Sequence, residues 1–223
     1  MNHFPLILAS QSPRRRQLLI EAGFMFEVSP PDAEVEDVRQ SGETPEHYVC
    51  RLAVQKANNV AAKFEQGLII ACDTVVLCKN QILEKPTSRN DARQMLRFSR
   101  GQIQSVLSGL CLLTKGIREK IREDIPESIS EDISETDGTT IVRTDQTTLQ
   151  MQPITDSEIE DYLDGGLWQG KAGAFGYQDR NHWLSIIDGS ESNIVGLPME
   201  LLKQLLKKFK GIKNSKFPIT LPD

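Results

Sequence analysis

The stretch LIIACDTVVLC, residues 68–78, constrains the fold most, because it is apolar on both faces of an extended chain except at Asp73-Thr74. Val and Ile are enriched in strands, and a strand that is apolar on both faces is typical of a sheet covered by helices on both sides. We therefore expect a buried central strand with one polar interruption.

Strand and helix signals alternate outward from this stretch. PLILAS, residues 5–10, is a short apolar run that reads as a strand. Ser12-Pro13 then supplies an N-cap and a proline at the first helical position, and Gly23 is a typical residue just beyond a helix end. The same reasoning predicts helices over 45–64, 89–98, 156–164 and 199–209, and strands over 24–28, 81–86, 102–114, 139–152 and 183–188. The pattern indicates a mixed α/β fold.

The composition of the 223 residues is that of an ordinary globular chain, with 39% hydrophobic and 26% charged residues and a formal net charge of −5. Apolar runs are too short for a membrane helix, and the N-terminus lacks the charge order of a secretory signal. The four cysteines show no CxxC spacing, which favours free thiols in a reducing compartment. We expect a cytoplasmic protein with neither a membrane anchor nor a broad nucleic-acid-binding face.

Two segments stand apart from the predicted core. Residues 123–137 hold seven acidic residues and no basic one, so we interpret 116–138 as an acidic, mobile insertion. The lysine-rich segment 211–223 is interpreted as a basic, flexible tail. The remaining chain, 1–210, is expected to form a single domain.

Local chemistry suggests two places for a functional site. The turn from Ser10 to Arg15 leads into a helix N-terminus, which attracts anions, and its arginines could clamp phosphate or simply face water. Asp73 lies in apolar sequence, where an unpaired carboxylate is costly, so it either caps the strand end or pairs with a lysine or a cation. Lys56 and Lys85 are available partners. The glycine-rich GKAGAFGYQ, residues 170–178, is a weak signal by itself.

Taken together in their order, these fragments resemble the Maf family of nucleoside triphosphate pyrophosphatases over about residues 5–206. The fragments are LASQSPRR (8–15), QKA (55–57), ACDTVV (71–76), LEKP (83–86), SG (108–109), GKAGAFGYQ (170–178) and SNIVGLP (192–198). The resemblance implies an elongated, bent mixed sheet flanked by helices, two lobes with a central cleft, and a homodimer.

The resemblance also implies roles for individual residues. Asp73 corresponds to the proton acceptor or metal-linked carboxylate, and Glu34 to a second acidic residue at the metal. Lys56 and Lys85 correspond to phosphate-contacting lysines, and Ser10 and Arg15 to the anion-binding turn. Three positions that set nucleotide preference correspond to Arg14, Thr74 and Gln178, the combination of the dTTP/UTP type.

The expectation from this resemblance is hydrolysis of dTTP or UTP, and of modified pyrimidine nucleotides, to the monophosphate and pyrophosphate, with Mg²⁺ or Mn²⁺ as cofactor. The physics agrees, because lysines, arginines and a metal stabilise the charge that develops on the leaving pyrophosphate. The alternative is a non-catalytic nucleotide-binding regulator of cell division.

Overall fold

The computed structural model describes residues 5–116, 139–179 and 181–210. The acidic insertion, from residue 117 onward, and the basic tail 211–223 therefore lie outside the described residues. The strands are β1 (Leu6–Leu8), β2 (Glu27–Val28), β3 (Gly67–Cys78), β4 (Gln81–Leu83), β5 (Ile103–Lys115), β6 (Thr140–Met151) and β7 (Leu184–Asp188). The helices are α1 (Pro13–Glu21), α2 (Pro45–Ala61), α3 (Arg89–Ser99), α5 (Asp156–Asp164), α6 (Glu191–Val195) and α7 (Met199–Lys210), with short 3-10 turns η1 (Ala172–Ala174) and η2 (Asn181–Trp183).

The strands form one seven-stranded sheet in the order β2-β1-β3-β5-β6-β7, with β4 paired to β3. The sheet is mixed, because β1 pairs in parallel with β2 and β3, whereas β3–β4 and β6–β7 are antiparallel. The predicted mixed α/β fold with helices flanking the sheet is thus confirmed. The predicted central strand is β3, which has a strand neighbour on each side.

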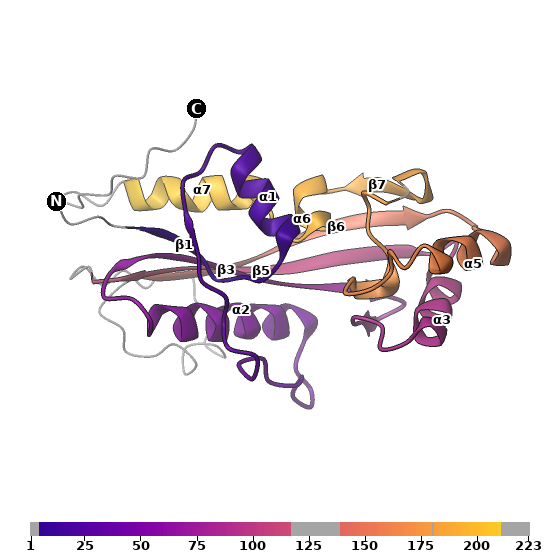
Figure 1. The fold of residues 1–223 in the computed structure, drawn as a ribbon, viewed down its shortest axis with the longest axis horizontal. Helices are drawn as coiled ribbons and strands as arrows, with labels where there is room; N and C mark the ends of the chain where they lie inside the picture. Colours follow the sequence, from indigo (N-terminus) through magenta and orange to yellow (C-terminus); the bar gives the residue numbers. More distant parts are fainter. Residues whose placement is uncertain (1–4, 117–138, 180, 211–223) are drawn as a thin grey trace. The chain divides into compact units, whose positions relative to one another are not determined.

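The chain divides into two compact units, of which the first comprises Met1–Asp73, Ser108–Asp145 and Gly196–Asp223. Its strands have two apolar faces, as the sequence predicts. On β1, Leu6 and Leu8 pack toward α1 and α7, whereas Ile7 packs toward α2. Figure 1 shows α1 and α7 on one side of these strands and α2 on the other. The buried central strand is a consequence of this three-layer arrangement.

The second unit comprises Thr74–Leu107 and Gln146–Val195. Its core joins α3 and α5 to the strands and to an aromatic group of Tyr162, Phe175 and Trp183. The hairpin between β3 and β4 turns at Lys79-Asn80, where both residues have positive φ, as a tight two-residue turn requires.

Most predicted helix starts are confirmed by their caps. Ser12, Thr44 and Ser88 each accept a hydrogen bond from the backbone N–H three residues on, and Thr155 forms a full capping box with Glu158. Three segments differ from the prediction, one of them 81–86, of which only Gln81–Leu83 is a strand. Only Glu27–Val28 of residues 24–28 is a strand, because Phe24 turns into the core instead. Part of the polar loop 189–198 folds into α6, whose Asn193 N–H is capped by Ser190 Oγ.

Candidate active site

Asp73 and Lys56 form a buried ion pair in the first unit. Lys56 Nζ donates to Asp73 Oδ1 at 2.6 Å, and the two residues are 5% and 8% exposed. The pairing follows from strand alternation, because Ile69 and Ala71 face α2 and Asp73 is next on that face. A buried charge of this kind persists only when it is paired, so the carboxylate is not a simple strand cap.

A second carboxylate contacts the same ammonium group. Glu36 Oε1 lies 3.0 Å from Lys56 Nζ, and the Glu36 side chain is 49% exposed. Glu36 is absent from the sequence-predicted residues, whereas the predicted Glu34, two positions earlier, is exposed. Four acidic residues lie within positions 32–37 of this loop, so the sequence does not say which of them meets Lys56.

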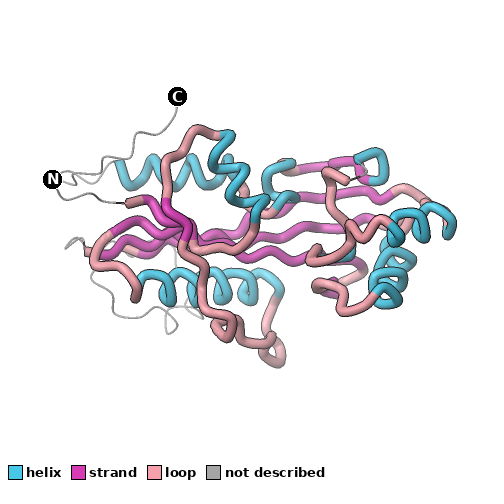
Figure 2. The backbone as a smooth tube through the Cα atoms, in the orientation of Figure 1, coloured by secondary structure: helices cyan, strands magenta, loops and turns pink. Residues whose placement is uncertain are grey.

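The loop that carries Glu34 and Glu36 is bound along α2 by polar contacts. Figure 2 shows residues 29–44 as a loop that leads into α2. Three α2 side chains at four-residue spacing, which puts them on one helical stripe, hold it together with Lys63 from the turn that follows the helix. The contacts are Arg51 Nε to Glu43 Oε1 (2.7 Å), Gln55 Nε2 to Asp37 Oδ2 (2.7 Å), Asn59 Nδ2 to Asp32 Oδ2 (2.8 Å) and Lys63 Nζ to Asp32 Oδ1 (2.8 Å). This stripe holds the loop at the level of Lys56.

The same contacts perturb two carboxyl groups of the loop. Hydrogen bonds from Arg51 hold the pKa of Glu43 below its usual value, and those from Lys63 and Asn59 lower the pKa of Asp32. Both carboxylates therefore bind α2 more strongly when ionised.

The turn between β1 and α1 builds a second polar cluster in the first unit. Ser10 is buried, and its Oγ accepts hydrogen bonds from Ser12 N (3.1 Å) and Arg15 Nη1 (3.4 Å). Arg15 Nε donates to Gly196 O at 2.7 Å, which fixes the guanidinium beside the helix N-terminus. Arg14 is half-buried in the same first turn, which contains no acidic residue.

The register of β1 and β3 relates the turn at Ser10 to the Lys56–Asp73 pair along the strand direction. Leu8 pairs with Ile70 in parallel, and Ala9 N donates to Ile70 O at 2.8 Å. Ser10 therefore lies at the level of Cys72, next to Asp73. Register thus places Ser10 level with the residue that precedes Asp73, the partner of Lys56.

The other three predicted residues belong to the second unit. Thr74 follows Asp73 on β3 and is half-buried, whereas Lys85 and Gln178 are exposed. Gly173 N donates to Glu84 O at 3.1 Å, so the segment before Gln178 is bound to the loop that carries Lys85. Gly173 adopts a φ of 67°, which favours glycine.

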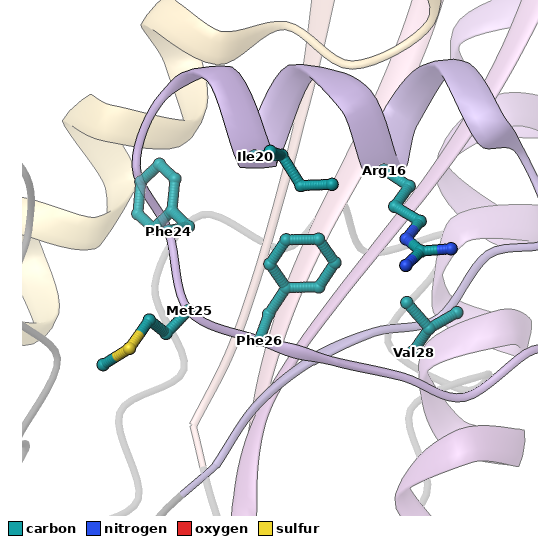
Figure 3. A pocket seen from close by; sticks show the side chains of 6 residues that line it. All are labelled: Arg16, Ile20, Phe24, Met25, Phe26 and Val28. Carbon is teal, nitrogen blue, oxygen red and sulfur yellow. The ribbon is translucent and has the colours of Figure 1, made fainter.

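A cavity of about 540 Å³ opens elsewhere in the first unit, beside α1 (Figure 3). It contains none of the predicted residues, and its lining is apolar apart from one arginine, which does not suit a triphosphate. The lining residues are Arg16, Ile20, Phe24, Met25, Phe26 and Val28.

The chain is similar to several known proteins. A family profile described as Maf-like protein matches residues 5–209. A dTTP/UTP pyrophosphatase of Rhodopirellula baltica is 44% identical over 206 residues, covering 92% of this chain and 82% of that protein. A dTTP/UTP pyrophosphatase of Koribacter versatilis is 36% identical over 204 residues, covering 91% and 93%. Among solved structures, the Ham1 protein of Staphylococcus aureus has 13% identity and a TM-score of 0.45, covering 92% and 97%.

Among the described residues, none of the helices combines the length and apolarity needed to cross a bilayer.

Proposed function

The chain belongs to the Maf-like protein family, and from this premise we propose that it hydrolyses dTTP or UTP to the monophosphate and pyrophosphate. Two relatives that it matches over more than nine-tenths of its length are named dTTP/UTP pyrophosphatases. The observation that carries the proposal is the buried pair of Lys56 and Asp73, next to the turn of Ser10 and Arg15. Because a buried ion pair stabilises a fold little or not at all, its presence in an otherwise apolar layer favours a functional role.

In this reaction water attacks the α-phosphorus, the bond to the bridging oxygen breaks, and pyrophosphate leaves. We assign Asp73 as the carboxylate that receives the proton of the attacking water. Lys56, with Lys85 of the second unit, would stabilise the negative charge that grows on the leaving phosphates. Ser10 and Arg15 would hold phosphate oxygens at the N-terminus of α1, where backbone N–H groups also favour anions.

The residues present fit a divalent cation that is held partly by substrate. Within residues 5–116, 139–179 and 181–210, no three His, Cys, Asp or Glu side chains gather as a ready-made metal site. Mg²⁺ is usually held by one or two carboxylates together with substrate phosphates, and Asp73 and Glu36 both lie within hydrogen-bond distance of one ammonium group. Asp73 would hold Mg²⁺ or Mn²⁺ with Glu34 or Glu36, and the bound cation would neutralise pyrophosphate charge.

Preference for the base is assigned to three side chains. Gln178 carries both a donor and an acceptor, which suits the imide edge of uracil or thymine. We propose that Arg14, Thr74 and Gln178 together favour dTTP and UTP, because a base with the wrong hydrogen-bonding edge would leave polar groups unpaired.

The decisive experiment measures pyrophosphate release from dTTP, UTP, CTP and GTP with Mg²⁺ or Mn²⁺. We expect release from dTTP and UTP and its abolition in Asp73→Asn. The variant should still fold, because Lys56 keeps its contact with Glu36 and the amide oxygen of asparagine can accept the same hydrogen bond. Near wild-type turnover in Asp73→Asn would reject the assigned role. Tight nucleotide binding without turnover in the wild type would instead favour a non-catalytic regulator.

A matched pair of variants tests the second acidic residue. Glu34→Gln and Glu36→Gln make the same chemical change two positions apart on one loop. The residue that contacts the metal is expected to raise the Mg²⁺ concentration needed for half-maximal activity, whereas the other variant should leave it unchanged.

Two broader features are also proposed. A homodimer is supported by the family resemblance, and sedimentation velocity tests it. A cytoplasmic location is supported by the four free, buried cysteines, which suit a reducing compartment.

A further inference from the structure

The second unit contains a buried polar cluster that none of the roles above uses. Asp179 Oδ2 accepts hydrogen bonds from Lys171 Nζ and from Tyr162 Oη, the latter at 2.7 Å. The side chains of Lys171 and Asp179 are only 15% and 14% exposed, and Tyr162 is fully buried. One carboxylate oxygen thus joins α5 to both ends of the glycine-rich segment 171–179.

A glycine in the backbone next to this cluster leaves room for the ion pair. A Cβ atom on Gly176 would lie 2.7 Å from Asp179 Oδ2 and 2.8 Å from Lys171 Nζ, so a side chain at this position would displace the ion pair. Asp179 N donates to Gly176 O at 3.0 Å, which closes a tight turn over residues 176–179. Gln178 lies inside this turn, immediately before the anchored carboxylate.

Aromatic packing also fixes the position of Tyr162 in the cluster. The Tyr162 ring lies 5.2 Å from the Phe175 ring and 5.4 Å from the Trp183 ring, and Phe175 stacks on Trp183 at 5.1 Å. The exposed Gln178 therefore lies in a turn whose last residue, Asp179, is held by buried side chains of the core. A buried ion pair with directional hydrogen bonds fixes the backbone of this turn in one position, whereas a non-directional apolar contact would allow several.

We propose that Lys171, Tyr162 and Asp179 are positioning residues that set Gln178 for recognition of the pyrimidine base. This inference rests on the proposed function, because it takes the nucleotide base as the ligand of Gln178. The three residues act through the turn and not by touching substrate. Their loss should therefore change the preference among bases more than the catalytic step.

The test compares UTP with CTP, which differ in the base edge that Gln178 would contact. In Asp179→Asn we expect the ratio of kcat/KM for UTP to that for CTP to fall about tenfold, mainly through a higher KM for UTP. Tyr162→Phe keeps the ring and removes one hydrogen bond, so its effect should have the same direction and be smaller. Asp161→Asn, an exposed carboxylate on α5, serves as the control.

A double variant separates positioning from general support of the fold. If Asp179 acts through Gln178, Asp179→Asn combined with Gln178→Ala should show the same UTP-to-CTP ratio as Gln178→Ala alone. Equal loss of kcat/KM for UTP and CTP in Asp179→Asn, or no loss, would overturn the inference.

The outcome can be told apart from failure of the proposed function. If the wild type releases no pyrophosphate, calorimetric affinities for UMP and CMP supply the same ratio without turnover. The inference then stands only if Asp179→Asn lowers the UMP preference, and it falls if that preference is absent or unchanged.

Discussion

Gly109 on β5 is the position where one added methyl group tests what sets the spacing between Lys56 and Asp73. A Cβ atom there would lie 2.4 Å from Val49 O, 2.5 Å from Val49 C and 2.7 Å from Cys50 N, all backbone atoms of α2. Ordinary contact between such atoms begins about 1 Å farther out. In Gly109→Ala, α2 must therefore move away from the strands by about 1 Å, since no flexible side chain can yield instead.

Displacement of α2 is expected to lower both the unfolding free energy and the catalytic activity, and the two effects can be estimated separately. Overpacking of a buried layer costs about 1–3 kcal/mol of unfolding free energy, or about 2–12 °C in Tm for a chain of this length. The same helix carries Lys56, whose Nζ lies 2.6 Å from Asp73 Oδ1, so a shift of about 1 Å must lengthen that hydrogen bond or force the lysine side chain to rearrange. Misplacement on this scale can lower kcat/KM by about 100-fold.

Urea unfolding and pyrophosphate release from UTP measure the two effects. Gly165→Ala is the matched control, because the same methyl group would meet only ordinary contacts of 3.4 Å or more at a residue with helical φ and ψ. The control should keep wild-type values in both assays. If Gly109→Ala also keeps them, the close approach of α2 to β5 does not set the position of Lys56.

Two further predictions concern titration and thiol chemistry. Hydrogen bonds from Arg93 lower the pKa of Glu160 from 4.5 to about 2, so the stability that this pair contributes is present above pH 4.5 and is lost as the pH falls toward 2. Glu160→Gln should flatten the decline of unfolding free energy over that range relative to Asp161→Asn, and parallel declines would contradict the assignment. Burial raises the pKa of Cys50 to about 12 and also raises that of Cys78. Mass spectrometry should therefore find iodoacetamide labelling of the four cysteines in urea but not in the native protein, and rapid native labelling of Cys50 would refute it.

Local signals were sufficient for the elements and for part of the site. Ser12-Pro13 and Thr44-Pro45 start α1 and α2 because capping depends on neighbouring residues alone. A carboxylate within an apolar strand needs a partner or a place at the strand end, and this requirement singles out Asp73 and offers Lys56 as a candidate partner. Family membership, predicted from the order of the motifs, is confirmed by the profile that covers residues 5–209.

Helix caps and strand alternation do not predict contacts between segments that are distant in the sequence. Nothing in the spacing of acidic residues distinguishes Glu34 from Glu36, because the choice depends on how the loop lies along α2. The glycine-rich motif 170–178 is a weak signal in the sequence, which does not reveal that Asp179, just beyond it, accepts hydrogen bonds from Lys171 and from Tyr162 of α5.

By itself, then, the sequence determined where most strands and helices begin, which faces are apolar, and that Asp73 needs either a partner or a place at the strand end. Only the tertiary structure decided that Glu36 shares Lys56, that Gly109 holds α2 close to β5, and that Asp179 anchors the turn around Gln178. The physical reason is the sequence separation of the contacts. Helix caps and strand alternation depend on residues a few positions apart, whereas the effect of a buried charge or of a missing Cβ depends on contacts with atoms far away in the sequence.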